Sequence, residues 1–193
     1  MASGGELTLK IVPGRGLQPL HLMECGDLRS LSAEALIAAL PVHIANSEFD
    51  TLQRTPGWQA DQLRLRSLAK DRAKDRGPGN ALVATIEHEP ITEVFTTFGE
   101  KRVSAEQVAG GLCRQVSEYP DGGVPVGPFL ADQLLLPLAI AVGSFSTGKL
   151  TSHSLTNLET IHRFLSDRVL RREGRASTMI ETREIDRPNR PAI

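Results

Sequence analysis

The sequence predicts an α+β fold, in which helices cover sheets in two-layer units. Runs of alternating polar and apolar residues indicate strands. In two places, apolar residues at helical intervals follow a pair of polar residues with capping-box spacing. Segments rich in Gly and Pro separate these runs. A chain of 193 residues is long enough for one medium or two small domains.

Net charge, apolar runs and cysteine content limit the classes of protein to which this chain can belong. The formal net charge of −1 gives no global electrostatic case for a nucleic-acid partner, so any such case must be local. No apolar run has the length of a membrane span, and no signal-peptide region precedes the first charged residues, which predicts a soluble cytoplasmic protein. Cys25 and Cys113 are expected to be reduced thiols. No His, Cys and carboxylate cluster has metal-ligand spacing, so no metal site of the protein's own is expected.

Near the amino terminus of the sequence, one predicted element is clear and the next is ambiguous. Residues 6–12 alternate after a glycine turn and predict a strand, and residues 13–16 predict a linker. Residues 28–40 are open to two interpretations. Their alanine content favours a helix, but the residue pattern alone leaves the segment ambiguous. Pro41 ends whatever precedes it and is accepted in the first turn of a helix.

A basic stretch follows the next predicted strand, which ends in the alternating run Leu63–Arg66. Six basic side chains stand against only Asp71 and Asp75. They are Arg64, Arg66, Lys70, Arg72, Lys74 and Arg76. Such a run is either a solvated face or a site that contacts RNA phosphates. Contacts from Arg and Lys to phosphates position an RNA strand without reading its sequence. Residues 77–79, Gly-Pro-Gly, form a loop that brings backbone close to a phosphate or to a neighbouring strand.

Two strands and a helix complete the first unit. Residues 81–87 and 92–98 predict a hairpin. Ser104 and Gln107 have capping-box spacing, and apolar residues at helical intervals continue to Tyr119. The resulting order of strand, helix, three strands and helix makes one α+β unit over about residues 14–124.

The second unit opens with a helix that starts at Pro128, a favoured first position. This helix is apolar nearly all round, so we expect it to be buried. Asp132 and Gln133 are its strongly polar residues. A carboxylate in the first turn of a buried helix must be satisfied, either by a structural bond or by a ligand.

The segment around His153 has the pattern of an anion site. Residues 143–148 predict a turn and residues 149–151 a short strand. Thr156 and Glu159 have capping-box spacing and predict the start of a helix that ends near Leu165. His153 would then lie just outside a helix amino terminus, where free N–H groups and the dipole attract anions and favour a neutral ring suited to nucleophilic attack. The alternative is a histidine that only hydrogen-bonds the turn.

The chain closes with a predicted hairpin, residues 169–171 and 178–182, and a frayed tail over 183–193. His162 shares the polar side of the preceding helix. The remaining histidines are expected to be ordinary surface or core residues. They are His21, His43 and His88.

Four blocks of this sequence resemble one family. Ser-His-Ser-Leu-Thr-Asn-Leu-Glu at 152–159 is similar to the carboxy-terminal histidine motif of the RNA 3'-terminal phosphate cyclases. Residues 127–134, 98–106 and 75–80 are similar to further blocks of that family, in family order. Four ordered blocks over more than half of the chain are far more specific than any single one. For residues 28–40, the resemblance implies a strand that ends before Pro41, followed by a helix over about 42–51, and we adopt this strand interpretation.

The resemblance implies a reaction and its residues. In that family the histidine takes up AMP covalently from ATP, which gives His153 the catalytic role. A segment that contacts the adenosine nucleotide corresponds to Phe129, Leu130, Ala131, Asp132 and Gln133. The family often has Tyr where this chain has Phe129, so one polar contact is lost and the aromatic face is kept. ATP with Mg²⁺ and RNA 3'-phosphate ends are the implied ligands, with the basic stretch up to Arg76 on the RNA backbone.

The resemblance also implies the domain organisation. Residues 1–13 would be a strand of the large domain, 14–126 the inserted small domain, 127–182 the last large-domain repeat and 183–193 a tail. Nothing matches the family's Gly-rich amino-terminal ATP motif. The chain is therefore expected to be the carboxy-terminal part of a cyclase or a short version, with an amino-terminal half-chain or a second copy as partner. Two alternatives remain, namely an inactive partial chain and a non-catalytic scaffold in RNA processing. The presence of His153 argues against the scaffold.

Overall fold

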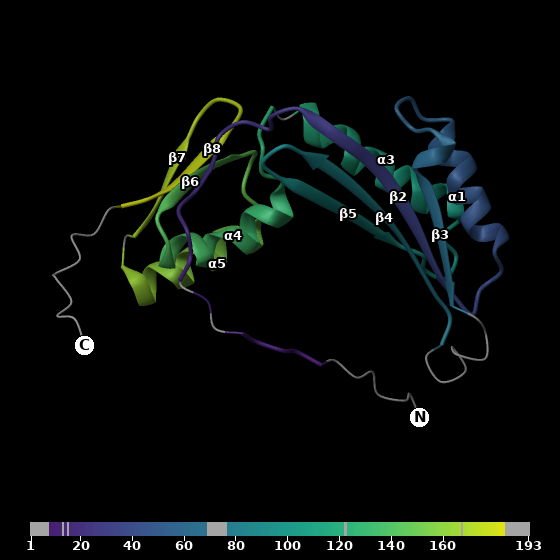
Figure 1. Ribbon diagram of the computed structural model, residues 1–193, viewed down its shortest axis with the longest axis horizontal. Coiled ribbons are helices and arrows are strands. Elements are labelled where there is room, and N and C mark those ends of the chain that lie inside the picture. Colours follow the sequence, from purple (N-terminus) through teal and green to yellow (C-terminus); the bar gives the residue numbers. More distant parts are fainter. Residues whose placement is uncertain are drawn as a thin grey trace. The chain divides into compact units, whose positions relative to one another are not determined.

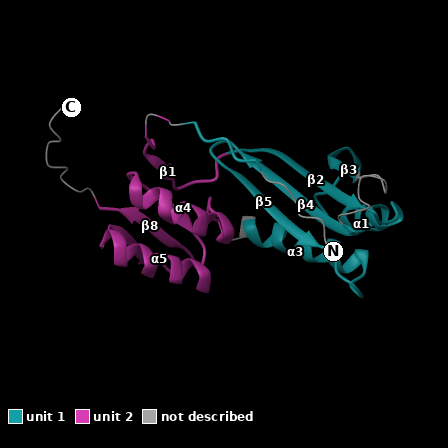
Figure 2. Cartoon of the chain, turned by 90° about the horizontal axis from the view of Figure 1, so that it is seen from below, with its two compact units in different colours: residues 1–12, 27–121 teal, residues 13–26, 122–193 magenta. Residues whose placement is uncertain are grey.

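The computed structural model describes residues 8–12, 14, 16–68, 77–121, 123–166 and 168–183. The chain forms two compact units, which are coloured separately in Figure 2. Unit 1 comprises residues 1–12 and 27–121, and unit 2 comprises residues 13–26 and 122–193. Each unit has helices packed on a four-stranded sheet, which confirms the predicted α+β class (Figure 1).

The sheet of unit 1 has the strand order β3-β2-β4-β5. Strand β2 runs parallel to β3 and antiparallel to β4, and β4 pairs with β5 as the predicted hairpin. The strands are β2 (Leu28–Ala38), β3 (Leu63–Leu68), β4 (Gly79–His88) and β5 (Thr92–Phe98). The strand interpretation of residues 28–40 is therefore confirmed, because β2 pairs on both sides and Ala33, Ala35 and Ile37 occupy alternate buried positions.

Two helices cover one face of this sheet (Figure 1). Helix α1 (His43–Gln53) and the short 3-10 helix η1 (Ala60–Gln62) connect β2 to β3, and α3 (Ala105–Asp121) follows β5. The predicted capping box is present at the start of α3, since Gln107 N donates to Ser104 Oγ at 3.3 Å and Ser104 N donates to Gln107 Oε1 at 2.9 Å. The core between sheet and helices includes Ala35, Ile37, Leu52, Leu82, Phe95 and Leu112.

A buried carboxyl group interrupts this apolar core. Glu48 of α1 is 0% exposed, and its Oε1 accepts a 2.5 Å hydrogen bond from Asn80 Nδ2. Glu48 Oε2 and Asn80 Oδ1 are buried without a hydrogen-bond partner among the described residues. Burial raises the pKa of Glu48, and the weaker effect of the Asn80 bond lowers it. A protonated Glu48 would offer Oε2 a proton to donate, which the ionised form lacks.

Glu48 should therefore make unit 1 less stable as the pH rises. A carboxyl whose pKa is higher in the folded than in the unfolded chain contributes its full stabilisation below the unfolded value, and that contribution is lost as the pH rises through the folded pKa. Glu48→Gln keeps a donor and an acceptor without charge, so we expect a free energy of unfolding about 1–3 kcal/mol higher than wild type at pH 8. The gain should be smaller at pH 5.

Urea unfolding followed by the fluorescence of Trp58, a core residue of unit 1, measures this difference at both pH values. Asp50→Asn is the matched control, because it removes a carboxylate from an exposed position of the same helix. An equal change for both variants, or no pH dependence in their difference, would contradict the prediction.

The sheet of unit 2 has the order β1-β6-β8-β7. Strands β1 and β6 are parallel, and the other neighbours are antiparallel. The strands are β1 (Leu20–Leu22), β6 (Gly143–Thr147), β7 (Val169–Glu173) and β8 (Thr178–Thr182). Helices α4 (Pro128–Ile140) and α5 (Ser152–Leu165) pack on it and on each other. Phe145, Leu135 and Ile180 are each 0% exposed in this core.

Two predicted elements near His153 are wrong. Residues 143–148 were expected to turn, but 143–147 form β6, which pairs with β1 on one side and β8 on the other. The glycines at 143 and 148 suggested a turn, whereas the alternation that buries Phe145 and Thr147 defines a strand. Residues 149–151, expected to be a strand, are not one; they form the connection into α5.

Two amino-terminal predictions also differ from the structure. Residues 8–12, the described part of the strand expected over 6–12, lie in no strand, and Leu9, Ile11 and Val12 are more than 70% exposed. Alternation alone does not make a strand where no described strand pairs with it. Residues 13–26 group with unit 2 rather than with the segment up to 126, because β1 pairs with β6.

Helix α4 is buried on one side only, which corrects the expectation of full burial. Its start at Pro128 is as predicted. Leu135 and Leu138 are buried, while Phe129, Leu136 and Ile140 are 49–59% exposed. The residues of the tail from 184 onward lie outside the described part of the chain. Among the helices that are described, none combines the length and the apolar character that crossing a bilayer requires.

Candidate active site

Helix α5 begins earlier than the sequence indicated. Its amino-terminal cap is Thr151, whose Oγ1 accepts a 3.1 Å hydrogen bond from Ser154 N. The predicted cap, Thr156, lies inside the helix and donates its hydroxyl to Ser152 O at 3.0 Å. His153 is therefore the second helical residue rather than a residue outside the helix. It keeps the expected neighbourhood of a helix amino terminus, because the first backbone N–H groups of a helix have no partner within it.

The side chain of His153 is held by a residue of the other helix. His153 Nδ1 lies 3.0 Å from Asp132 Oδ2. Asn157, one turn after His153, donates from Nδ2 to Asp132 Oδ1 at 3.1 Å and to Asp132 O at 3.2 Å. Asp132 is the fifth residue of α4, not part of its first turn as expected, and its carboxylate is satisfied by α5. The Asp132 side chain is 22% exposed and that of His153 is 82% exposed.

This arrangement assigns different roles to the two ring nitrogens. An ionised Asp132 only accepts hydrogen bonds, so Nδ1 must carry the proton that it donates. In the neutral ring Nε2 then holds the free lone pair. An oriented imidazole with a free Nε2 in an exposed position is suited to nucleophilic attack on an electrophile that approaches from solvent.

A hollow of about 560 Å³ runs along the same face of α5. Its lining contains no Asp, Glu, Lys or Arg and consists of Ser152, His153, Thr156, Asn157 and Thr160. The hollow begins at the amino terminus of the helix, where backbone N–H groups and the helix dipole favour a phosphate. Among the described residues, no group of three His, Cys, Asp or Glu side chains is placed to hold a metal ion.

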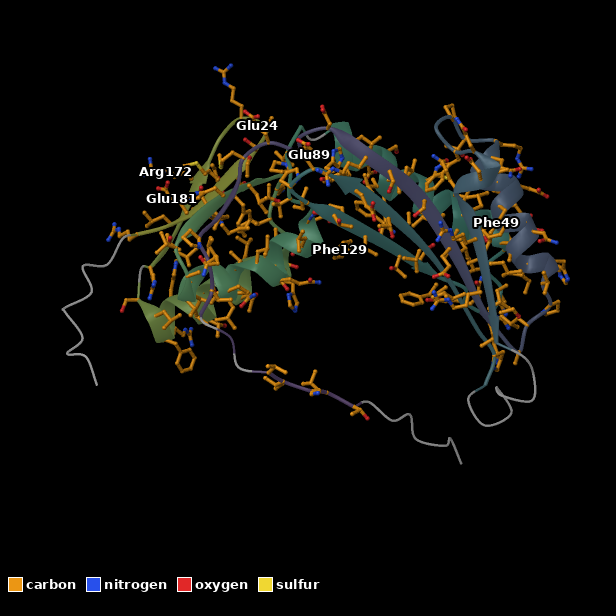
Figure 3. The ribbon with its side chains drawn as sticks, in the orientation of Figure 1. Glu24, Phe49, Glu89, Phe129, Arg172 and Glu181 are labelled. Atoms are coloured by element: carbon orange, nitrogen blue, oxygen red, sulfur yellow. The ribbon has the colours of Figure 1, made fainter. Side chains whose placement is uncertain are left out.

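The predicted nucleotide-contacting residues divide into three environments. Phe129 and Gln133 are exposed on α4, and Figure 3 labels Phe129. Leu130 is half-buried, and Ala131 is fully buried in the core of unit 2. Among these five residues, Asp132 forms a hydrogen bond with His153. Phe129 and Gln133 are thus accessible to a ligand, whereas Ala131 can act only through the packing of the helix.

The predicted RNA-contacting residues belong to unit 1 where they are described. Arg64 and Arg66 are both exposed on β3, and Arg66 Nε lies 2.9 Å from Glu34 Oε1. One of these two cations is therefore already paired. The other four residues of the basic stretch lie outside the described residues. They are Lys70, Arg72, Lys74 and Arg76.

Sequence reasoning missed two residues of the site. Asn157 fixes Asp132, and its signal was the spacing of four residues from His153, which places both side chains on one helical face. Thr151 caps the helix, and its signal was the hydroxyl three residues before Ser154. The Thr156–Glu159 spacing competed with this signal and was the stronger match to the capping-box pattern.

Comparison with known proteins matches residues 1–169 to a family described as RNA 3'-terminal phosphate cyclase. The chain belongs to the RNA 3'-terminal phosphate cyclase family. Three curated relatives carry the same name and come from strains of Pseudomonas aeruginosa; two are 39% and one is 38% identical over 169 residues. These 169 residues are 87% of this chain and 48% of each relative, so the chain spans about half the length of these relatives.

Membership of the cyclase family confirms the resemblance recognised in the sequence. The matched region contains the whole Asp132–His153–Asn157 arrangement and all of unit 1. It ends at residue 169, the first residue of β7, so most of the closing hairpin lies beyond it. The relatives bear the name of a ligase-type enzyme that acts on RNA.

Proposed function

We propose that this chain carries the AMP-accepting histidine of an ATP-dependent RNA 3'-phosphate cyclase. The reaction converts an RNA 3'-phosphate into a 2',3'-cyclic phosphodiester and consumes ATP to AMP and pyrophosphate. The observation that carries the proposal is the 3.0 Å contact between His153 Nδ1 and Asp132, which leaves Nε2 free beside a helix amino terminus. We place the reaction in the cytoplasm.

In the first step, the Nε2 lone pair of His153 attacks the α-phosphorus of ATP. A P–N bond forms, the bond to the bridging oxygen breaks, and pyrophosphate leaves with its electrons. The ring, now substituted at Nε2 and still protonated at Nδ1, carries a positive charge. Asp132 Oδ2 lies where it stabilises that charge, and Asn157 keeps the carboxylate in place.

In the second step, an oxygen of the RNA 3'-phosphate attacks the phosphorus of the bound AMP. The P–N bond breaks and its electrons return to Nε2, which regenerates His153. The RNA end is then activated as a phosphoanhydride. The neighbouring 2'-hydroxyl attacks the 3'-phosphorus, loses its proton to solvent and expels AMP.

Several further residues have supporting roles in this proposal. Phe129 offers an exposed aromatic face for the adenine, and Gln133 an exposed amide on the same helix. A divalent cation, Mg²⁺, would enter with ATP and screen its phosphates. Arg64 and the basic residues that follow it would hold RNA backbone in unit 1. Asp132, which is engaged by His153, positions that histidine rather than the nucleotide.

A partial chain is the second candidate, and the coverage of the relatives favours it. The matched residues are 48% of each relative's length. If the remaining part of a cyclase supplies groups that bind ATP, this chain would accept AMP only when that part is added. It would act as one half of the enzyme.

Incubation with ATP labelled at the α-phosphate tests the proposal. We expect label that remains on the denatured protein, is released by acid and maps to the peptide that contains His153, because a phosphoramidate is acid-labile. His153→Ala should retain none. The relevant comparison has two arms, the chain alone and the chain with an amino-terminal half of a cyclase. Absence of label in both arms, on folded protein, would contradict the proposal, and label only in the second arm would show a partial chain.

A further inference from the structure

A basic groove lies on unit 2 between α5 and the edge strand β7. It consists of two hollows, of about 280 and 630 Å³, which share Leu155 of α5 and Arg171 of β7. Strand β7 is the last strand of the sheet, so no further described strand closes this side. Register places Arg171 opposite the buried Ile180, on the sheet face that the helices cover, and its side chain therefore borders α5.

Cations outnumber carboxylates in this groove. Lys149, Arg171 and Arg175 line the first hollow with Glu173, and Arg183 joins Arg171 in the second hollow with Glu159. Glu173 is already engaged, since its Oε1 lies 3.4 Å from an Arg171 nitrogen. Within the described residues, the other three cations have no ion pair and are exposed. They are Lys149, Arg175 and Arg183.

On the opposite face of the β7–β8 hairpin, an arginine is paired with a carboxylate. Arg172 points away from the helices, and its guanidinium lies 2.6 Å from Glu181 (Figure 3). On the groove side, three cations that lie outside the strands have no ion pair among the described residues. On a chain with a net charge of −1, this local excess indicates an anionic ligand.

The position of the groove indicates which anion it takes. The two hollows lie on the side of α5 opposite the His153 hollow, since Leu155, Leu158 and His162 project about half a turn away from His153. The groove nevertheless starts at Lys149, only two residues before the helix cap, and follows a helix that is about 20 Å long. A ligand whose body lies in the groove and whose end reaches His153 must therefore turn around the amino-terminal end of α5, past Lys149.

We propose that this groove binds the phosphodiester backbone of a single-stranded RNA whose 3'-phosphate reaches His153. The assignment rests on the proposed cyclase function and adds a binding site to it. Arginine suits this role because its planar guanidinium contacts two phosphate oxygens at once. Three of the four cations, Arg171, Arg175 and Arg183, lie beyond residue 169, where the family match ends. Lys149 and the α5 residues of the groove lie within that match.

Salt-dependent binding of a fluorescent oligoribonucleotide with a 3'-phosphate tests the site. For single strands each phosphate contact contributes about 0.7 to the slope of log affinity against log salt. Lys149→Ala with Arg175→Ala should therefore lower the magnitude of that slope by about 1.4 and weaken binding at low salt. Both side chains are exposed, so folding should be unaffected, which circular dichroism checks. Arg163→Ala, an exposed cation of the same helix outside the groove, is the matched control and should bind as wild type.

Competition distinguishes the RNA backbone from other anions. Inorganic triphosphate or polyglutamate that displaces the RNA at equal concentration of charge, with the same dependence on Arg175, would overturn the RNA assignment in favour of a nucleotide or an acidic peptide. A double variant with an unchanged slope, or an equal loss for Arg163→Ala, would overturn the groove itself. RNA binding in this assay needs no ATP, so it is measured separately from AMP uptake. Failure of AMP uptake with intact groove-dependent binding would therefore count against the catalytic proposal alone.

Discussion

Replacing Asp132 by asparagine is expected to slow AMP uptake at His153 by about 10³–10⁴-fold, close to the complete loss expected for His153→Ala. A loss of this order follows when the aspartate that orients a catalytic histidine is changed to asparagine. The amide of Asp132→Asn can donate to Nδ1, which favours the ring tautomer with the proton on Nε2. The nitrogen that should attack ATP then has no free lone pair. The initial rate of labelling with α-labelled ATP measures the loss.

A spectroscopic measurement separates this positioning role from a structural one. Nitrogen-15 NMR of the neutral ring should show the Nδ1–H tautomer in the wild-type protein and the Nε2–H tautomer in Asp132→Asn. Gln133→Ala, which changes the next residue of α4 at an exposed position, is the matched control and should keep the wild-type tautomer. The same tautomer in wild type and Asp132→Asn would refute the positioning role, whatever the labelling rate. This measurement needs no ATP and applies equally to a partial chain.

Gly143→Ala is expected to destabilise unit 2 by about 3 kcal/mol, the upper end of overpacking effects. Gly143 pairs with Leu20 where β6 meets β1. A Cβ atom at this position would overlap Leu20 O and lie 2.9 Å from Leu20 N, so the backbones of the two strands must separate. Loss of this pairing leaves the edge of β6 uncovered.

Hydrogen exchange of the β1 and β6 amides measures this effect, together with urea unfolding followed by circular dichroism. Fluorescence is uninformative, because the single Trp and the single Tyr, Trp58 and Tyr119, lie in the core of unit 1. Gly148→Ala is the matched control, since a Cβ there meets nothing within 4 Å, and we expect a change of at most about 0.5 kcal/mol. Equal protection in both variants would show that β1 contributes nothing to unit 2.

The local sequence pattern correctly predicted the elements that are determined by their own residues. The hairpin of β4 and β5, the cap at Ser104 and the start of α4 at Pro128 followed from short-range signals. Prediction failed where the secondary structure of a segment depends on strands that are distant in sequence. The strand β6 looked like a turn because Gly143, its first residue, and Gly148, just after its end, were considered without the partners β1 and β8. The expected amino-terminal strand has no described partner over residues 8–12.

The sequence predicted residues of the candidate site, but it did not predict the hydrogen bonds between them. His153 and Asp132 were both singled out, one for its place near a helix start and one as a carboxylate on an apolar helix. Their contact could not be read from the sequence, because 21 residues and strand β6 separate them. Asp132 was expected to contact a nucleotide, yet its two oxygens are occupied by His153 and Asn157. The packing of α4 on α5 determines which groups the Asp132 oxygens contact.

The parallel pairing of β1 with β6 sets an order of events during synthesis on the ribosome. His21 of β1 lies beside Ser144 of β6, 123 residues later, and the whole folded segment of unit 1 lies between them in sequence. At about 5–20 residues per second, β1 waits roughly 6–25 s for its partner to be translated. Residues 27–121 can fold during that interval. The sheet of unit 2, the unit that carries His153, can therefore be completed only after residues 27–121 have been translated.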